Sequence, residues 1–357
     1  MDEITIADRK IGEGHPAYFI ADIGANHDGQ LERARNLIHL AAEAGADAAK
    51  FQNFQAPKIV SDYGFKHLEG KQSHQDAWKK SVFEVYQDAS IPFDWTPILK
   101  EECDKAGIHY FSSPYDYEST DMLESYVPAY KAGSGLMSWP ELLIYMARKE
   151  VPILVSTGAC ELGEVVDNMR AILEVNDQVV LFQCNTNYTG SDENFDHIHL
   201  KVLKTYRQLF PDVVLGLSDH TAGHATVLGA VAIGARVIEK HFTDDTTREG
   251  PDHPFAMDPH TWSDMVARTR ELERAMGSPL KQVAENEKET VYVQRRCLRA
   301  ARDIRTGEVL TREMIDVLRP AAPGAIQARD LERVLGTKIV VDIPMGEALM
   351  WTMLVSE

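Results

Sequence analysis

The sequence predicts a closed (β/α)8 TIM barrel followed by a small, β-rich second domain. Eight short apolar runs alternate with helical segments over about 240 residues, and most of these runs stop at polar residues. Beyond residue 280 the alternation ends, and short extended pieces separated by turns follow. A doubly wound open sheet is the alternative, but its first turn would carry a GxGxxG pattern, whereas this chain has Gly24-Ala25-Asn26.

The predicted barrel strands are apolar runs bounded by turn-forming or charged residues. They are Tyr18–Ile23, Ala46–Phe51, Ile108–Ser112, Ala129–Ala132, Ile153–Val155, Val179–Cys184, Val213–Leu217 and Val237–Ile238. Helical spacing of apolar residues predicts helices at Leu31–Ala44, Trp95–Ala106, Ala225–Gly234 and Pro259–Met276.

A long, charged excursion from Phe54 to Ile91 interrupts the alternation. It is expected to contain helix and shows no strand pattern. A segment of this length after a barrel strand is typical of a lid or a substrate-binding loop.

The predicted organisation is a catalytic barrel at 1–280, a charged linker at 281–294 and the second domain at 295–357. The second domain is expected to contain extended pieces at Arg295–Ala301, Glu308–Leu310, Gly336–Val341 and Leu349–Met350. Because about sixty residues lie near the lower limit for independent folding, this domain is expected to lean on the barrel or on a second subunit.

Composition excludes several classes of function. The net charge of -18 argues against a binder of nucleic acid or of anionic membranes. The four cysteines are far apart and form no CxxC pair, so neither a zinc knuckle nor a disulfide framework is indicated. The first ten residues, MDEITIADRK, do not read as a signal peptide, and no apolar run approaches the ~20 residues of a membrane span. A soluble, cytoplasmic protein is the expectation.

Two histidines follow consecutive strands in the same position. His220 closes Ser-Asp-His after one strand, and His241 closes Glu-Lys-His after the next. The bland interpretation is that each one caps a strand. Two imidazoles at neighbouring carboxyl ends of parallel strands are, however, typical of a site for a divalent cation.

Other polar side chains stand at the remaining strand ends. In a barrel all of them would meet at one mouth. They include Asp22, Lys50, Gln52, Ser113, Ser134, Ser156, Tyr188, Ser218 and Glu239. A lysine with several hydroxyls would bind a phosphate in spite of the acidic net charge, and one carboxylate could transfer protons. Taken alone, a lysine such as Lys50 is more often solvated or salt-bridged.

With these residues laid out, the chain resembles the sialic acid synthase family, which comprises the N-acetylneuraminate, legionaminate and pseudaminate synthases. The resemblance covers nearly the whole length. Its segments here are IADIGANHDG, AAKFQNF, YFSSPYD, YKAGSGLMSWPELL, ILVSTGA, GLSDHT and IEKHFTDDTTREGPDH. The segment RRCLRAARDIRTGEVLTREMIDVLRPAAPG resembles the antifreeze-protein-like (SAF) module of the same family.

The resemblance implies an enzyme that condenses phosphoenolpyruvate with an open-chain sugar aldehyde to give a 2-keto-3-deoxy sugar acid and phosphate. It also implies a divalent cation, usually manganese with magnesium and cobalt as alternatives, and a homodimer in which the SAF module of one subunit covers the barrel mouth of the other.

The resemblance also assigns roles to individual residues. His220 and His241 would be the metal ligands, and Arg319 would enter the partner's site, although a plain surface arginine is an equal reading. Asp22 and Glu239 are the candidates for proton transfer, together with Lys50 as a catalytic group. Phosphoenolpyruvate would be held by Lys50, Ser113, Ser134, Ser156 and Ser218, and the sugar by Gln52, Tyr188, Asp252 and Arg319.

Three departures from the family pattern lie on the acceptor side. Asp22 replaces a glutamate, Leu136 replaces an acidic residue after Gly-Ser-Gly, and Asn185–Ser191 replaces NxYPTP. We therefore expect the phosphoenolpyruvate chemistry to be retained, with an acceptor that is either N-acetylmannosamine-like or a variant of it, and Leu136 would suit a deoxy aldehyde. The alternatives are an octulosonate-type condensing barrel, a metal-dependent hydrolase and a catalytically degenerate carbohydrate-binding homologue.

Overall fold

The protein was analysed as a computed structural model that describes residues 3–70, 75 and 78–355. The chain divides into two compact units, Met1–Gly277 and Ser278–Glu357. The division falls near the predicted boundary at residue 280. Each unit has a hydrophobic core of its own.

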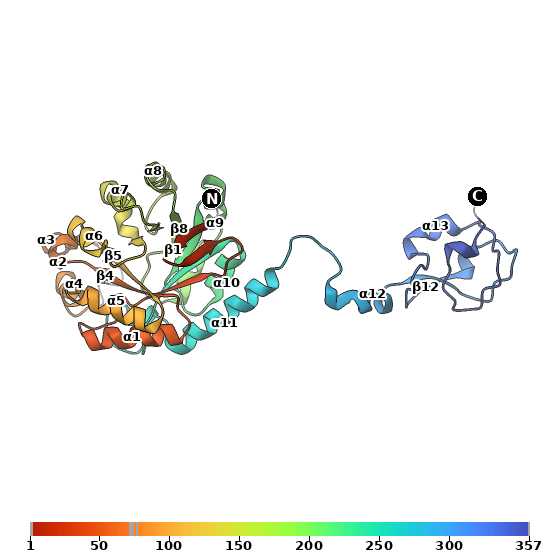
Figure 1. Ribbon diagram of the computed structural model, residues 1–357, viewed down its shortest axis with the longest axis horizontal. Coiled ribbons are helices and arrows are strands. Elements are labelled where there is room, and N and C mark those ends of the chain that lie inside the picture. The colour runs from red at the N-terminus through yellow and green to blue at the C-terminus, as the bar shows by residue number, and fades with distance from the viewer. Residues whose placement is uncertain (1–2, 71–74, 76–77, 356–357) are drawn as a thin grey trace. The chain divides into compact units, whose positions relative to one another are not determined.

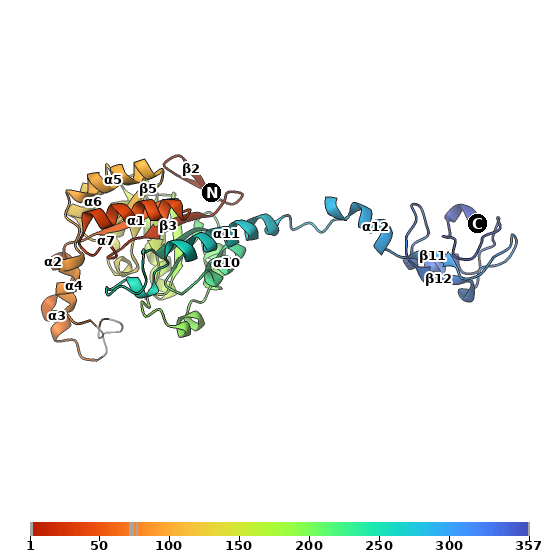
Figure 2. The ribbon, with the colours of Figure 1, turned by 90° about the horizontal axis from the view of Figure 1, so that it is seen from below.

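The first unit is a nearly closed parallel barrel with helices around its outside (Figures 1 and 2). Its hydrogen-bonded strand order is β5-β4-β3-β10-β9-β8-β7-β6, and the end strands β5 and β6 lie next to each other. The strands are β3 (Tyr18–Asp22), β4 (Ala48–Asn53), β5 (His109–Pro114), β6 (Tyr130–Ala132), β7 (Ile153–Ser156), β8 (Val179–Cys184), β9 (Val214–Asp219) and β10 (Ala235–His241). The predicted fold class is confirmed. The observed ends lie within three residues of those predicted, and β10 is longer than expected.

The helices that cover the barrel expose polar residues and bury one apolar face. They are α1 (Leu31–Glu43), α5 (Trp95–Ala106), α6 (Tyr117–Leu123), α7 (Pro140–Ala147), α8 (Leu162–Leu173), α9 (Val202–Leu209), α10 (Ala225–Ala232) and α11 (Pro259–Met276). Local chemistry sets their ends. Asp258 caps α11 by accepting from the backbone of Thr261, and Gly107 ends α5 in the left-handed region at φ 74°.

An N-terminal hairpin was not predicted. It consists of β1 (Glu3–Ile6) and β2 (Arg9–Gly12), which pair antiparallel. Its residues Ile4, Ile6 and Ile11 share a buried cluster with residues from the first halves of the barrel strands. The hairpin therefore closes the amino end of the barrel, and the functional residues are left to the opposite end.

The predicted excursion after β4 is helical where it is described. It holds α2 (Ala56–Ile59), α3 (Asp62–Lys66) and α4 (Val82–Ala89). Part of its charged stretch, residues 71–74 and 76–77, lies outside the described residues.

The second unit contains less regular β-structure than predicted. Helix α12 (Lys288–Gln294) lies in the predicted linker, and it is followed by β11 (Cys297–Ala300), β12 (Ile315–Leu318) and α13 (Leu331–Val334). The two strands form one antiparallel pair, whereas the other predicted extended pieces make isolated bridges such as Val309 with Lys338. These extended pieces and the turns between them surround a small hydrophobic core that includes Leu298, Ile315 and Leu349.

No helix in the described part of the chain is both long enough and apolar enough to cross a membrane.

Candidate active site at the carboxyl end of the barrel

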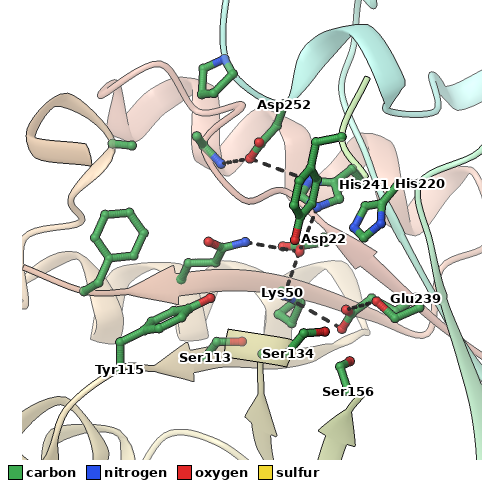
Figure 3. Close-up of a pocket in the computed structure, with 18 of the residues that line it drawn as sticks. Asp22, Lys50, Ser113, Tyr115, Ser134, Ser156, His220, Glu239, His241 and Asp252 are labelled. Carbon is green, nitrogen blue, oxygen red and sulfur yellow. Dashed lines mark hydrogen bonds and ion pairs between the residues drawn. The ribbon is translucent and has the colours of Figure 1, made fainter. Parts of the chain in front are cut away.

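Every candidate residue except Arg319 lines one pocket at the carboxyl ends of the strands (Figure 3). The pocket has a volume of about 180 Å³. The candidates it brings together are Asp22, Lys50, Gln52, Ser113, Ser134, Ser156, Tyr188, Ser218, His220, Glu239, His241 and Asp252. Parallel strands deliver their last residues to the same end of a barrel, which explains this convergence from six strands and from the segments that follow β6, β8, β9 and β10.

Lys50 lies between two carboxylates. Its Nζ is 2.7 Å from Asp22 Oδ2 and 3.8 Å from Glu239 Oε2, and all three side chains are buried. Burial disfavours the charged ammonium, but Asp22 and Glu239 outweigh this effect and raise the pKa of Lys50. Lys50 is thus a salt-bridged lysine, as the bland interpretation held, and it is also a fixed cation in the pocket wall.

A second buried lysine, Lys131, was not among the predicted site residues. Its Nζ donates to Ser156 Oγ at 2.7 Å and lies 3.4 Å from Glu239 Oε1. Burial lowers the pKa of Lys131, an effect that Glu239 only partly offsets. The sequence did contain a clue, because a lysine in the middle of the short buried strand β6 needs a polar environment inside the barrel.

The four candidate serines surround these lysines. Ser134 Oγ accepts from the backbone N–H of Gly158 at 2.9 Å, and Ser218 Oγ donates to Glu239 Oε1 at 3.0 Å. Ser113 Oγ and Glu239 Oε2 are buried and have no hydrogen-bond partner among the described residues. Buried polar atoms without partners are costly in an empty protein, so these two are expected to contact a ligand.

His220 and His241 face each other across the mouth, with ring centroids 5.4 Å apart. His220 Nδ1 donates to the carbonyl oxygen of Asn185 at 2.8 Å, which leaves the lone pair of Nε2 free to bind. Burial lowers the pKa of His220 to about 4 and also lowers that of His241, so both imidazoles are neutral at pH 7. His241 Nδ1 has no hydrogen-bond partner in the described residues and lies 3.7 Å from Asp252 Oδ2.

These two imidazoles fit a divalent cation as a pair of nitrogen donors. Within residues 3–70, 75 and 78–355, no group of three or more histidine, cysteine, aspartate or glutamate side chains comes together as a metal site.

The acceptor-side candidates lie beside the histidines. Gln52 Nε2 donates to Asp22 Oδ2 at 3.3 Å, and Asp252 Oδ2 accepts from the backbone N–H of Ala25 at 2.9 Å. The Tyr188 ring lies 4.4 Å from the His220 ring, centroid to centroid. Burial raises the pKa of Asp252.

Two residues expected on the acceptor side, Leu136 and Arg319, do not line the pocket. The idea that Leu136 faces the acceptor is wrong, because Leu136 packs into the core around the barrel and does not line the pocket. It lies in a 3-10 turn, Ser134–Ser138, that directs Ser134 into the mouth and Leu136 away from it. Arg319 is exposed on the second unit after β12, and its role in a partner's site stays a prediction.

Comparisons with known proteins show the family to which the chain belongs. A model of the NeuB family matches residues 37–281, and a model of the SAF domain matches residues 295–355. The chain belongs to the NeuB family. It is similar to the N,N'-diacetyllegionaminic acid synthase of Legionella pneumophila, with 32% identity over 95% of both chains. It is also 31% identical to the human N-acetylneuraminate-9-phosphate synthase, over 96% of this chain and 94% of the human one.

Among solved structures, the spore coat polysaccharide biosynthesis protein SpsE of Bacillus subtilis matches with a TM-score of 0.65. The two chains are 30% identical, and the match covers 99% of each. As a member of this family of synthases, the chain is an enzyme, a transferase that forms a carbon–carbon bond.

Proposed function

We propose that this enzyme condenses phosphoenolpyruvate with an open-chain aldose, with the help of a divalent cation, to give a 2-keto-3-deoxy sugar acid of the sialic acid type and phosphate. The observation that carries the proposal is the pairing of two buried lysines and two unpartnered buried oxygens with two neutral histidines in one pocket. Relatives named as N-acetylneuraminate-9-phosphate, N,N'-diacetyllegionaminic acid and pseudaminic acid synthases support it.

The two lysines supply positive charge for an anionic substrate, although the chain as a whole is negatively charged. The net charge of -18 repels an anion, and phosphoenolpyruvate carries a phosphate and a carboxylate. Lys50 and Lys131 are fixed on β4 and β6, and the hydroxyls of Ser113, Ser134, Ser156 and Ser218 provide donors around them. In this proposal, an anion bound here receives charge-assisted hydrogen bonds inside a water-poor pocket, where such bonds are strong.

The histidines are proposed to hold the cation. His220 Nε2 and the unpartnered His241 Nδ1 are the donor atoms that the chain offers. A divalent cation bound there would polarise the aldehyde oxygen. Tyr188 packs against His220, and Phe255 lies 4.9 Å from the His241 ring, so both imidazoles are held by aromatic contacts.

The atoms of the proposed reaction balance as follows. C3 of phosphoenolpyruvate forms a bond to the aldehyde carbon, whose oxygen gains a proton. Water adds to C2, which has become electron-poor because the C2=C3 electrons formed the new bond, and the water loses one proton. The C2–O bond to phosphate then breaks as the C2 hydroxyl loses its proton to form the ketone, and the leaving phosphate takes that proton up. Glu239, whose Oε2 has no hydrogen-bond partner among the described residues, is placed to accept the proton from water. Asp22, whose Oδ2 is 2.7 Å from Lys50 Nζ, fixes that lysine in its charged form beside the reacting groups.

Phosphoenolpyruvate labelled with ¹⁸O at the bridging oxygen tests this reaction. The proposal predicts that the label leaves with phosphate, and only when an aldose is present. A metal-dependent hydrolase that attacks phosphorus would instead leave the label in pyruvate without any aldose, and that result would contradict the proposal.

A further inference from the structure

The two sides of the pocket differ in chemistry. Figure 3 shows Ser134 and Ser156 on one side and Asp252 on the other, with Asp22 and Lys50 between them. The serine side is built by strand ends. The pocket also has a largely apolar wall from segments outside the barrel strands, made by Phe54, Trp78, Val85, Tyr86, Ala89 and Pro251.

Helix α4 supplies the centre of this wall through a regular stripe. Val82, Val85, Tyr86 and Ala89 recur at spacings of three and four residues, so they share one face of the helix. Val82 is buried, and Glu84, Gln87 and Asp88 on the other face are exposed. Ser81 and Glu84 form a capping box that fixes the start of the helix. Val85, Tyr86 and Ala89 of this stripe line the pocket, and Val82 is buried.

Aromatic contacts tie this wall to the rest of the site. The Phe54 ring lies 5.3 Å from the Tyr86 ring and 5.7 Å from the Tyr115 ring, centroid to centroid. Tyr86 also lies close enough to Asp252 for that carboxylate to contribute to the raised pKa of Tyr86, after burial as the main cause. Tyr86 of the stripe thus lies near Asp252, and Phe54 connects it to Tyr115 in the pocket wall.

The hydrogen-bonding groups of this wall are the Tyr86 hydroxyl and the Trp78 indole N–H, and Gln75 also lines the pocket. Phe54, Val85 and Ala89 have no side-chain hydrogen-bonding atoms. The nearest carboxylate, Asp252, already accepts from Ala25 through Oδ2. A hydroxyl pressed against Val85 or Ala89 would lose its hydrogen bonds, whereas a methyl group would gain contact.

We propose that Val85, Tyr86 and Ala89 select an aldose acceptor that carries an apolar group, a deoxy methyl or an acyl methyl, at the end remote from its aldehyde. This inference rests on the proposed condensation, because the aldehyde must face phosphoenolpyruvate and so directs the far end of the sugar toward α4. It replaces Leu136 with α4 as the source of acceptor preference.

The test compares kcat/KM for N-acetylmannosamine with kcat/KM for its 6-deoxy analogue, measured by phosphate release. Hydrophobic pockets discriminate between a methyl group and a similar polar group by about 10- to 100-fold, so the wild-type enzyme is expected to prefer the deoxy sugar by a factor in this range. Val85→Thr keeps the side-chain shape and adds a hydroxyl, and it is expected to lower this preference about 10-fold. Ala89→Ser is a second variant with the same expected direction.

Gln87→Thr is the matched control, because it places the same residue on the exposed face of the same helix. It should leave the preference unchanged. A wild-type preference for the 6-hydroxy sugar, or equal effects of Val85→Thr and Gln87→Thr, would overturn the role of α4 while phosphate release continued. Absence of phosphate release with every aldose would instead overturn the proposed function, and this inference with it.

Discussion

Replacing Lys131 with methionine is expected to change the KM for phosphoenolpyruvate while leaving the free energy of unfolding nearly unchanged. The variant keeps most of the side-chain length, removes the charge, and deletes the hydrogen bond from Nζ to Ser156 Oγ. Hydrogen bonds to charged groups contribute about 1.5–3 kcal/mol, which corresponds to a rise of about 10- to 150-fold in KM for phosphoenolpyruvate.

Stability should respond differently. Burial lowers the pKa of Lys131, so its charge is costly in the empty protein, and methionine removes that cost. Glu239 loses a partner at 3.4 Å but keeps the hydrogen bond from Ser218 and the ion pair with Lys50. The free energy of unfolding is therefore expected to stay within about 1 kcal/mol of the wild-type value.

Steady-state kinetics with varied phosphoenolpyruvate and urea unfolding measure the two quantities. Lys149→Met is the control, since Lys149 forms ion pairs with Asp121 and Glu124 and does not line the pocket. An unchanged KM together with a large loss of stability would show that Lys131 is structural. The proposed role of Lys131 in binding the anion would then have to be abandoned.

Three further predictions concern the neighbourhood of the site. Gly24 has φ 49°, and a side-chain carbon there would lie 2.6 Å from Asp252 Oδ2. Because Gly24→Ala would displace that carboxylate, it should reduce kcat/KM more than tenfold. Wild-type kinetics in this variant would contradict the tight packing around Gly24. Burial lowers the pKa of His27 from 6.5 to about 4; the unfolded chain binds more protons in this window, so the free energy of unfolding should fall by about 3 kcal/mol as pH drops from 6.5 to 4. Urea titrations should show a shallower fall for His27→Gln, and identical slopes would refute the assignment. If Arg319 acts in the partner's site, mixing inactive Arg319→Ala and His220→Ala subunits should restore about a quarter of the wild-type activity, and no recovery would argue against a shared site.

The fold could be predicted because the barrel repeats one unit eight times. Each strand is a short apolar run with a polar end, and this pattern survives errors of a few residues at the boundaries. The N-terminal hairpin was not predicted because its strands are only four residues long and mix charged with apolar side chains. The second unit was expected to be richer in strands, but its extended pieces mostly make single bridges whose partners are distant in sequence.

Most candidate side chains could be placed because the end of a strand determines where a residue lies. Lys131 was missed because Ala132 separates it from the polar Gly-Ser-Gly turn and its neighbours in the sequence are apolar. Leu136 was misplaced because the direction of a side chain in a 3-10 turn depends on the local backbone and not on its closeness to Ser134 in the sequence. The wall formed by α4 could not be foreseen, because the packing of α4 against the mouth depends on tertiary contacts such as that between Phe54 and Tyr86.

The most direct test of the central claim is phosphate release from phosphoenolpyruvate with manganese across a panel of aldoses that includes N-acetylmannosamine, its 6-deoxy relatives, mannose and arabinose. The account predicts release that requires both substrates, is abolished by EDTA, and is lost in His220→Ala while the variant stays folded. Release without any aldose, or undiminished release in EDTA and in His220→Ala, would contradict it.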